Sequence, residues 1–99
     1  MENNKKILIV EDERSLSQAL VNKLTLEGFA TLTAKNGEEG LDVALREHPD
    51  MILLDIVMPV MDGMTMLKKL RRESEWGKTA KVIILTNLTS ADEQRNRDI

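Results

Sequence analysis

Short apolar runs that alternate with longer segments of helical period constrain the fold of this chain more than any other feature. Residues 7–10, 51–54 and 82–85 are uniformly apolar, as parallel strands are when both faces of their sheet are covered. Residues 30–34 alternate and are rich in small or β-branched residues, which is typical of a half-exposed outer strand. Strands that alternate with helices form βαβ units. The sequence therefore predicts an α/β fold with a parallel sheet.

Two helices are predicted from matching N-cap signals. Ser15 and Asn36 are each followed three residues later by Gln or Glu, the spacing of a capping side chain and the residue that bonds back to it. Leucines recur every four residues after Ser15. Gly28 and Pro49 are the expected stops of the first and second helix.

A third helix is expected over about residues 63–72. The residues expected to face inward are Met64, Leu67 and Leu70. Trp76 is expected in the following loop, where it covers the core, and His48 at the exposed end of the second helix. Residues 91–98 follow a capping signal but have almost no apolar face, so a helix there would be marginal.

Length and composition limit the classes of function. The 99 residues suffice for one domain, and 41% apolar with 31% charged residues is ordinary for a globular chain. The net charge of −3 provides no basic footprint for nucleic acid. No apolar stretch could span a membrane, residues 1–6 lack the apolar core of a signal peptide, and there is no cysteine. We therefore expect a cytoplasmic domain that binds neither nucleic acid nor a membrane.

Polar side chains gather where the predicted strands end. They are Glu11, Asp12, Asp55 and Thr86. In an open parallel sheet the carboxyl ends of the strands form one edge, and ligands bind there. A lone Asp at a strand end more often caps a turn, but three carboxylates held together need a metal or proton between them, and hard divalent cations prefer oxygen ligands. The pattern predicts metal-dependent chemistry with phosphate as the natural reactant.

Three stretches resemble the receiver domain of bacterial response regulators. The first consists of the apolar residues 7–10 followed by Glu11-Asp12-Glu13. The second is the run Asp55-Ile56-Val57-Met58-Pro59-Val60-Met61-Asp62-Gly63. The third is Thr86, directly after the predicted fourth strand. Together these motifs are highly specific, and the resemblance covers the whole chain. It implies a flavodoxin-like open parallel sheet, the receiver fold, with strand order 2-1-3-4.

The resemblance also implies roles for individual residues. Asp55 would be the nucleophile that accepts a phosphoryl group from a histidine kinase, a phosphotransfer protein or a small phosphodonor. Glu11 and Asp12 would hold Mg²⁺ or Mn²⁺ together with Asp55 and the backbone carbonyl of Val57. Thr86 would hydrogen-bond the phosphoryl group and take part in the switch.

The chain departs from the family pattern at its carboxyl end. Receivers continue through a fifth strand, which ends in a lysine, and a fifth helix, and residues 1–99 contain neither. We therefore expect one receiver domain over residues 1–99, truncated at the carboxyl end, with no output domain. Its fourth strand would be an uncovered edge, and the sheet face beside the first helix would expose apolar side chains. Such surfaces favour self-association.

Three classes of function fit these features to different degrees. The first is a phosphoacceptor that acts as a signalling switch and is a substrate of its own phosphorylation, with no enzymatic turnover. The second is a receiver remnant that serves as a dimerisation or protein-interaction module. The third is a hydrolase with an aspartyl-phosphate intermediate. It is disfavoured because Val57 stands where such phosphatases place a second acid.

Overall fold

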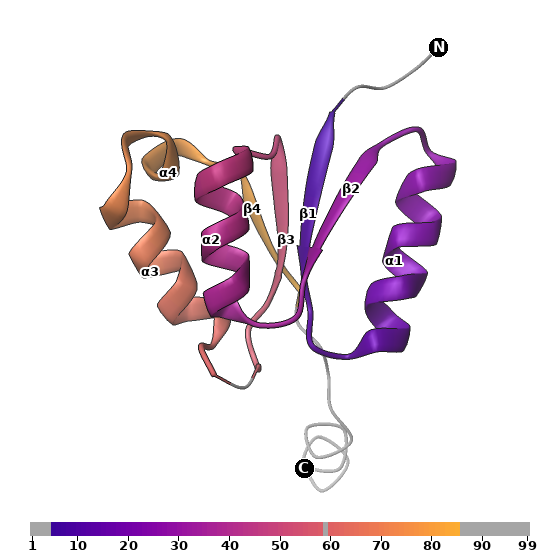
Figure 1. The fold of residues 1–99 in the computed structure, drawn as a ribbon, viewed down its shortest axis with the longest axis horizontal. Coiled ribbons are helices and arrows are strands. Elements are labelled where there is room, and N and C mark those ends of the chain that lie inside the picture. The colour runs from indigo at the N-terminus through magenta and orange to yellow at the C-terminus, as the bar shows by residue number, and fades with distance from the viewer. Residues whose placement is uncertain (1–4, 59, 86–99) are drawn as a thin grey trace, which may run out of the picture.

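The described part of the chain forms a four-stranded parallel sheet with helices on both faces. The computed structural model describes residues 5–58 and 60–85. The strands are β1 (Lys6–Val10), β2 (Ala30–Ala34), β3 (Met51–Asp55) and β4 (Val82–Leu85), in the order β2-β1-β3-β4. Figure 1 shows β1 and β3 at the centre of the sheet. The predicted α/β fold and strand order are confirmed.

The register of the central pair aligns the ends of two strands. Leu8 pairs with Ile52 and Val10 with Leu54, so the residues that follow Val10 and Leu54 emerge side by side. Asp55 in turn pairs with Leu85, the last residue of β4. The carboxyl ends of β1, β3 and β4 therefore lie at one edge of the sheet. Thr86 and residues 90–98, for which predictions were made above, lie outside the described residues.

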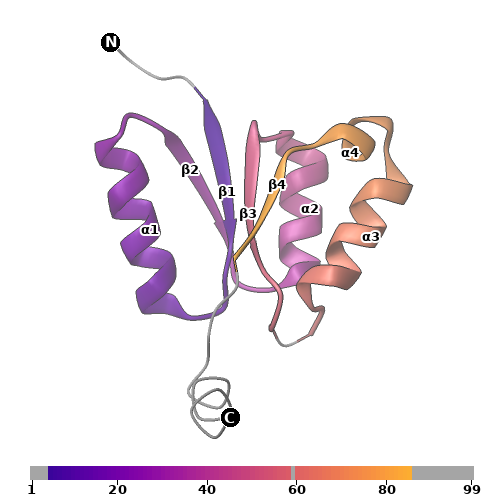
Figure 2. The same cartoon turned by 180° about the vertical axis from the view of Figure 1, so that it is seen from behind.

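The helices divide unequally between the two faces of the sheet. Among the described elements, α1 (Arg14–Leu26) is the only helix on one face, as Figure 2 shows from behind. Helices α2 (Gly37–Glu47), α3 (Gly63–Glu73) and the short α4 (Glu75–Thr79) lie on the other. Within the described part of the chain, no helix combines the length and the apolar character needed to cross a membrane.

The main core lies between the sheet and α2 and α3. Leu8, Val10, Ile52 and Leu54 are at most 1% exposed and face this side. A smaller core on the other face contains Ile7, Ile9 and Leu53, packed against Leu20, Val21 and Leu24 of α1. None of the residues of α1 is itself buried. The main core therefore contributes more of the apolar burial that stabilises the fold.

The cap prediction is confirmed for the second helix and wrong for the first. The side chain of Asn36 accepts a hydrogen bond from the backbone N–H of Glu39 at 2.8 Å. Helix α1 begins at Arg14, and its N-cap is Glu13, whose side chain makes no capping bond. The first turn closes when Ser17 N–H donates to Glu13 C=O at 2.9 Å. Ser15 lies inside that turn, so its hydroxyl cannot cap the helix.

The predicted inward face of the third helix is partly wrong. Met64 is 42% exposed, whereas Met66 and Leu70 are fully buried. The helix starts at Gly63, which packs against the backbone of Asp55. Counting from Gly63, positions i+3 and i+7 face the sheet, and these are Met66 and Leu70. Met64 is rotated by about 100° from that face.

A short helix replaces the loop predicted around Trp76. Ser74 caps α4 by accepting a hydrogen bond from Gly77 N–H at 2.7 Å. Trp76 packs against the main core, which confirms its expected covering role. Its ring stacks on His48 with centroids 4.4 Å apart. His48 is exposed and has a φ of 46° at the end of α2, as its predicted helix-end position requires.

The expected exposure of the sheet face beside α1 is wrong for β1. Ile7 and Ile9 are only 3% and 0% exposed, because the leucines of α1 cover them. In the part of the sheet that the structure describes, exposure is concentrated on β4, where Ile83 is 47% and Ile84 38% exposed. Self-association remains a prediction, and it rests on β4.

Candidate functional site

Three carboxylates meet where β1 and β3 end. Glu11 and Asp12 follow β1 directly, and Asp55 is the last residue of β3. One ligand oxygen from each lies within 4.8 Å of the other two. The neighbouring register of β1 and β3 explains this proximity. The structure therefore brings together three of the residues that the sequence predicted for the site.

The three acids differ in their exposure to solvent. Glu11 and Asp55 are each 2% exposed, whereas Asp12 is exposed. Burial raises the pKa of Glu11 from 4.5 to about 7, and the neighbouring carboxylates of Asp55 and Asp12 add to that rise. The backbone N–H of Glu13, which donates to Glu11 Oε2 at 3.0 Å, acts in the opposite direction. Glu11 therefore holds a proton near neutral pH when nothing else neutralises it.

The Asp55 carboxylate is oriented by the loop that follows it. Val57 N–H donates to Asp55 Oδ1 at 3.3 Å. The loop is closed by Gly63 N–H, which donates to Ile56 C=O at 2.9 Å. A side chain at Gly63 would collide with the backbone carbonyl of Asp55, so glycine permits α3 to start beside the acid.

The donor set fits a hard divalent cation. All three side-chain donors are carboxylate oxygens, the ligands that Mg²⁺ and Mn²⁺ take. Glu11 Oε1 is buried and has no hydrogen-bond partner in the described structure, although buried oxygens are normally satisfied. A cation would satisfy that oxygen and neutralise the cluster. The residues present therefore fit a magnesium ion.

The roles of two further residues predicted for the site, Val57 and Thr86, remain predictions. Val57 lies in the loop after Asp55, and its side chain is 68% exposed. Its backbone carbonyl as a metal ligand stays a prediction. Thr86 follows β4 outside the described residues, so its role also stays a prediction.

The sequence reasoning missed two features that build the loop beside the site. Asp62 caps α3 by accepting a hydrogen bond from Thr65 N–H at 2.8 Å, and that bond lowers the pKa of Asp62. Gly37 N–H donates to Met61 C=O at 3.0 Å, which joins the loop to the start of α2. The Asp-Gly pair at the helix start was a usable capping signal. The second contact joins residues far apart in the sequence, and no local pattern indicates it.

Comparison with known proteins identifies the class that this fold and site define. The family model described as Response regulator receiver domain matches residues 7–97. The chain therefore belongs to the receiver domains of two-component response regulators. The predicted family is confirmed.

Curated relatives support the same assignment. The chain is 43% identical over 89 residues to the probable transcriptional regulator ycf27 of Porphyra purpurea. The matched region covers 89% of this chain and 35% of that protein. It is 40% identical over 83 residues to sporulation initiation phosphotransferase F of Bacillus subtilis (strain 168), covering 84% and 64%. The chain thus spans about a third of the length of the first relative.

A solved structure shares both the fold and part of the sequence. It is the receiver domain of a sensor histidine kinase from Pseudomonas aeruginosa PAO1, with a TM-score of 0.81 and 28% identity. The match covers 93% of this chain and 75% of that one. That structure has a magnesium ion coordinated in its active-site cleft.

Proposed function

We propose that this receiver accepts a phosphoryl group on Asp55 from the phosphohistidine of a histidine kinase or phosphotransfer protein, in a Mg²⁺-dependent reaction, and acts as a signalling switch. The observation that carries the proposal is the position of the buried Asp55 within 4.8 Å of the ligand oxygens of Glu11 and Asp12. The domain would be a substrate of this transfer, without turnover of its own.

The transfer is a displacement at phosphorus. A carboxylate oxygen of Asp55 forms the new P–O bond while the P–N bond to the donor imidazole breaks, and the bonding electron pair leaves with the imidazole nitrogen, which takes up a proton. The hydrogen bond from Val57 N–H to Asp55 Oδ1 fixes the orientation of the nucleophile. Burial removes water from Asp55 and strengthens electrostatic interactions around it.

The metal would be held by Glu11, Asp12 and Asp55, with the carbonyl of Val57 as a further proposed ligand. A bound Mg²⁺ neutralises the charge that spreads over the phosphoryl oxygens during transfer. The orphaned Glu11 Oε1 supports this assignment, and so does the magnesium ion in the Pseudomonas aeruginosa receiver. Thr86 is our proposed hydrogen-bond donor to the phosphoryl group.

The alternative of a receiver remnant that only mediates interactions is not favoured. That alternative needs an incomplete sheet that is open to another chain, and α1 covers the sheet at Ile7 and Ile9. The acid cluster, by contrast, retains every carboxylate that the chemistry requires.

Phosphorylation in vitro tests the proposal. Acetyl phosphate with Mg²⁺ should add one phosphoryl group to the intact protein, as measured by mass spectrometry under conditions that preserve acyl phosphates. Asp55→Asn should abolish the addition. Asp62→Asn is the matched control, because it changes an exposed acid of the same loop and keeps a good N-cap residue. Modification that persists in Asp55→Asn, or that is unchanged when EDTA replaces Mg²⁺, would overturn the proposal.

A further inference from the structure

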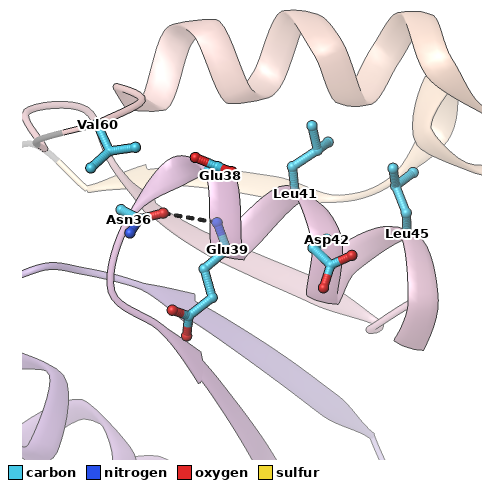
Figure 3. A pocket seen from close by; sticks show the side chains of 7 residues that line it. All are labelled: Asn36, Glu38, Glu39, Leu41, Asp42, Leu45 and Val60. Carbon is cyan, nitrogen blue, oxygen red and sulfur yellow. Dashed lines mark hydrogen bonds between the residues drawn. The ribbon is translucent and has the colours of Figure 1, made fainter.

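An open groove lies along α2 on the side of α3, and its lining does not include Glu11, Asp12 or Asp55. Its volume is about 650 Å³, within the range of ligand sites. Its apolar lining is Leu41, Leu45 and Val60, and its acidic lining is Glu38, Glu39 and Asp42. Figure 3 shows Leu41 and Leu45 projecting from α2 on the side of α3, with Val60 on the loop above Asn36.

The groove follows a single face of α2. Glu38, Leu41, Asp42 and Leu45 are spaced i, i+3, i+4 and i+7, which places them along one side of a helix. Seven residues of helix extend over about 10 Å, or two turns. The lining residues of α2 therefore extend over a length that two turns of a second helix would match.

Val60 is held in a conformation that its side chain disfavours. Its φ is 69°, in the left-handed region, where a β-branched residue is a clear outlier. Its side chain is also 76% exposed, so the strain is not compensated by apolar burial within the chain. Glycine or asparagine would adopt this backbone more easily. The strained position presents an apolar side chain at the mouth of the groove.

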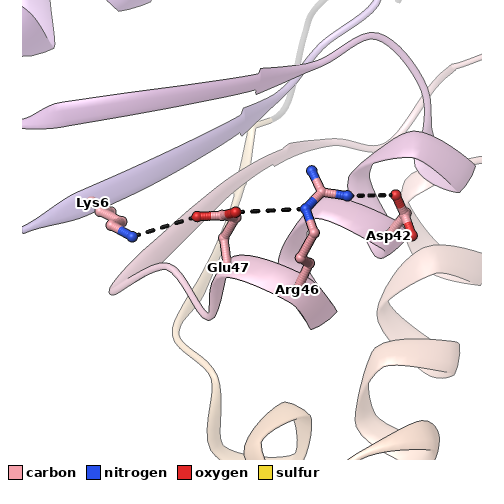
Figure 4. Close-up of polar contacts among 4 residues, drawn as sticks. All are labelled: Lys6, Asp42, Arg46 and Glu47. Atoms are coloured by element: carbon pink, nitrogen blue, oxygen red, sulfur yellow. Dashed lines mark hydrogen bonds and ion pairs between the residues drawn. The ribbon is translucent and has the colours of Figure 1, made fainter.

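The charge at the groove is not fully compensated within the chain. Asp42 forms an ion pair with Arg46 at 2.9 Å. Arg46 also pairs with Glu47, and Glu47 pairs in turn with Lys6, as Figure 4 shows. Among the described residues, neither Glu38 nor Glu39 has an ion-pair partner. Figure 3 shows that the Glu39 side chain points away from Leu41 and Leu45. The apolar centre of the groove is therefore bordered by one negative charge, that of Glu38, which has no ion-pair partner among the described residues. A partner with basic residues beside an apolar stripe is complementary to it.

We propose that this groove docks a short amphipathic helix of a partner protein. The apolar side chains of that helix would pack among Leu41, Leu45 and Val60. Its Lys or Arg residues would face Glu38. Leu41 and Leu45 are half-buried and pack against the main core, whereas Val60 is exposed. An apolar surface with a polar rim is the usual form of such a docking site. The proposal uses neither Asp55 nor its neighbours Glu11 and Asp12, so it can fail while the proposed phosphoryl transfer holds.

Synthetic peptides provide the probe. The first is a helical peptide of about 15 residues with a leucine stripe flanked by lysines. A second carries Glu in place of Lys, and a third carries Ala in place of Leu. In ¹⁵N NMR titrations of the 99-residue chain, the lysine peptide should shift the amide signals of residues 38–45 and of Val60. The two other peptides should bind at least about tenfold more weakly, because each lacks one of the two complementary features.

Variants of the protein separate docking from folding. Val60→Asn should raise the midpoint of thermal unfolding, because it relieves the left-handed strain, yet weaken binding of the lysine peptide by about fivefold to tenfold. A merely structural role of Val60 could not move the two quantities in opposite directions. Glu38→Gln should weaken binding, whereas Glu73→Gln, which removes the same charge outside the groove, should leave it unchanged. Shifts centred elsewhere, equal binding of the three peptides, or unchanged affinity in Val60→Asn would overturn the proposal.

Discussion

Replacing Glu11 with glutamine should stabilise the metal-free protein, by an amount that grows with pH. Glu11 is 2% exposed and lies beside the carboxylates of Asp55 and Asp12. These conditions raise its pKa from 4.5 to about 7. Between those values the folded state keeps a proton that the unfolded state has released, so the stability of the native protein falls as pH rises.

The magnitude follows from the difference between the two pKa values of Glu11. One pKa unit corresponds to about 1.4 kcal/mol, so the rise to about 7 costs the folded protein about 3 kcal/mol once pH exceeds 7. Glutamine is uncharged at every pH and resembles protonated glutamate in size. Glu11→Gln should therefore match the wild type near pH 4, below both pKa values, and exceed its unfolding free energy by about 3 kcal/mol near pH 8.

Urea denaturation in EDTA at the two pH values measures this difference. Added Mg²⁺ should then stabilise the wild type and have little effect on the variant, because the variant has lost one of the cation's carboxylates. Glu73→Gln removes an exposed carboxylate outside the cluster and should change stability little at either pH. Equal stability of wild type and Glu11→Gln at pH 8 would refute the assignment of a buried, repelled carboxylate.

Five further substitutions test other parts of the structure. Met66→Ala should lower the unfolding free energy by about 2–5 kcal/mol, whereas Met64→Ala should change it by less than about 0.5 kcal/mol, both measured by urea denaturation. Asn36→Ala should cost about 1 kcal/mol by the same measurement, because the α2 cap is lost. Gly63→Ala should cost about 3 kcal/mol through collision with the Asp55 carbonyl, and hydrogen exchange should show the loss of protection at the start of α3. In Val57→Asn the phosphoryl group on Asp55 should be hydrolysed severalfold faster than in the wild type, because an amide side chain can orient the attacking water and valine cannot. Mass spectrometry over time measures the loss of the phosphoryl group.

The sheet and the acid cluster could be predicted because their signals are local. Uniformly apolar runs mark central strands, and the carboxyl ends of parallel strands share an edge whatever the details of packing. Glu11, Asp12 and Asp55 therefore meet as expected. The Asn36 cap was also predictable, because the bond joins residues only three apart.

Other features depend on contacts that the local pattern does not contain. Met64 and Met66 are chemically identical, and their burial is decided by where α3 begins, which depends on the contact of Gly63 with Asp55. Ser15 and Gln18 have the spacing of an N-cap and its partner, but α1 already begins at Arg14, so Ser15 lies inside the helix. The strained φ of Val60 is set by a loop joined to α2 through Gly37 and Met61.

The proposed function depends above all on one divalent cation held jointly by Glu11, Asp12 and Asp55. Mn²⁺ can replace Mg²⁺ at oxygen sites and broadens the NMR signals of nearby nuclei because it is paramagnetic. Trace Mn²⁺ should first broaden the amide signals of residues 11–13 and 55–57, leave the Trp76 indole signal sharp, and lose its effect when excess Mg²⁺ is added. Broadening centred on Glu38 and Asp42, or unchanged in Asp12→Ala, would contradict a metal site at the ends of β1 and β3.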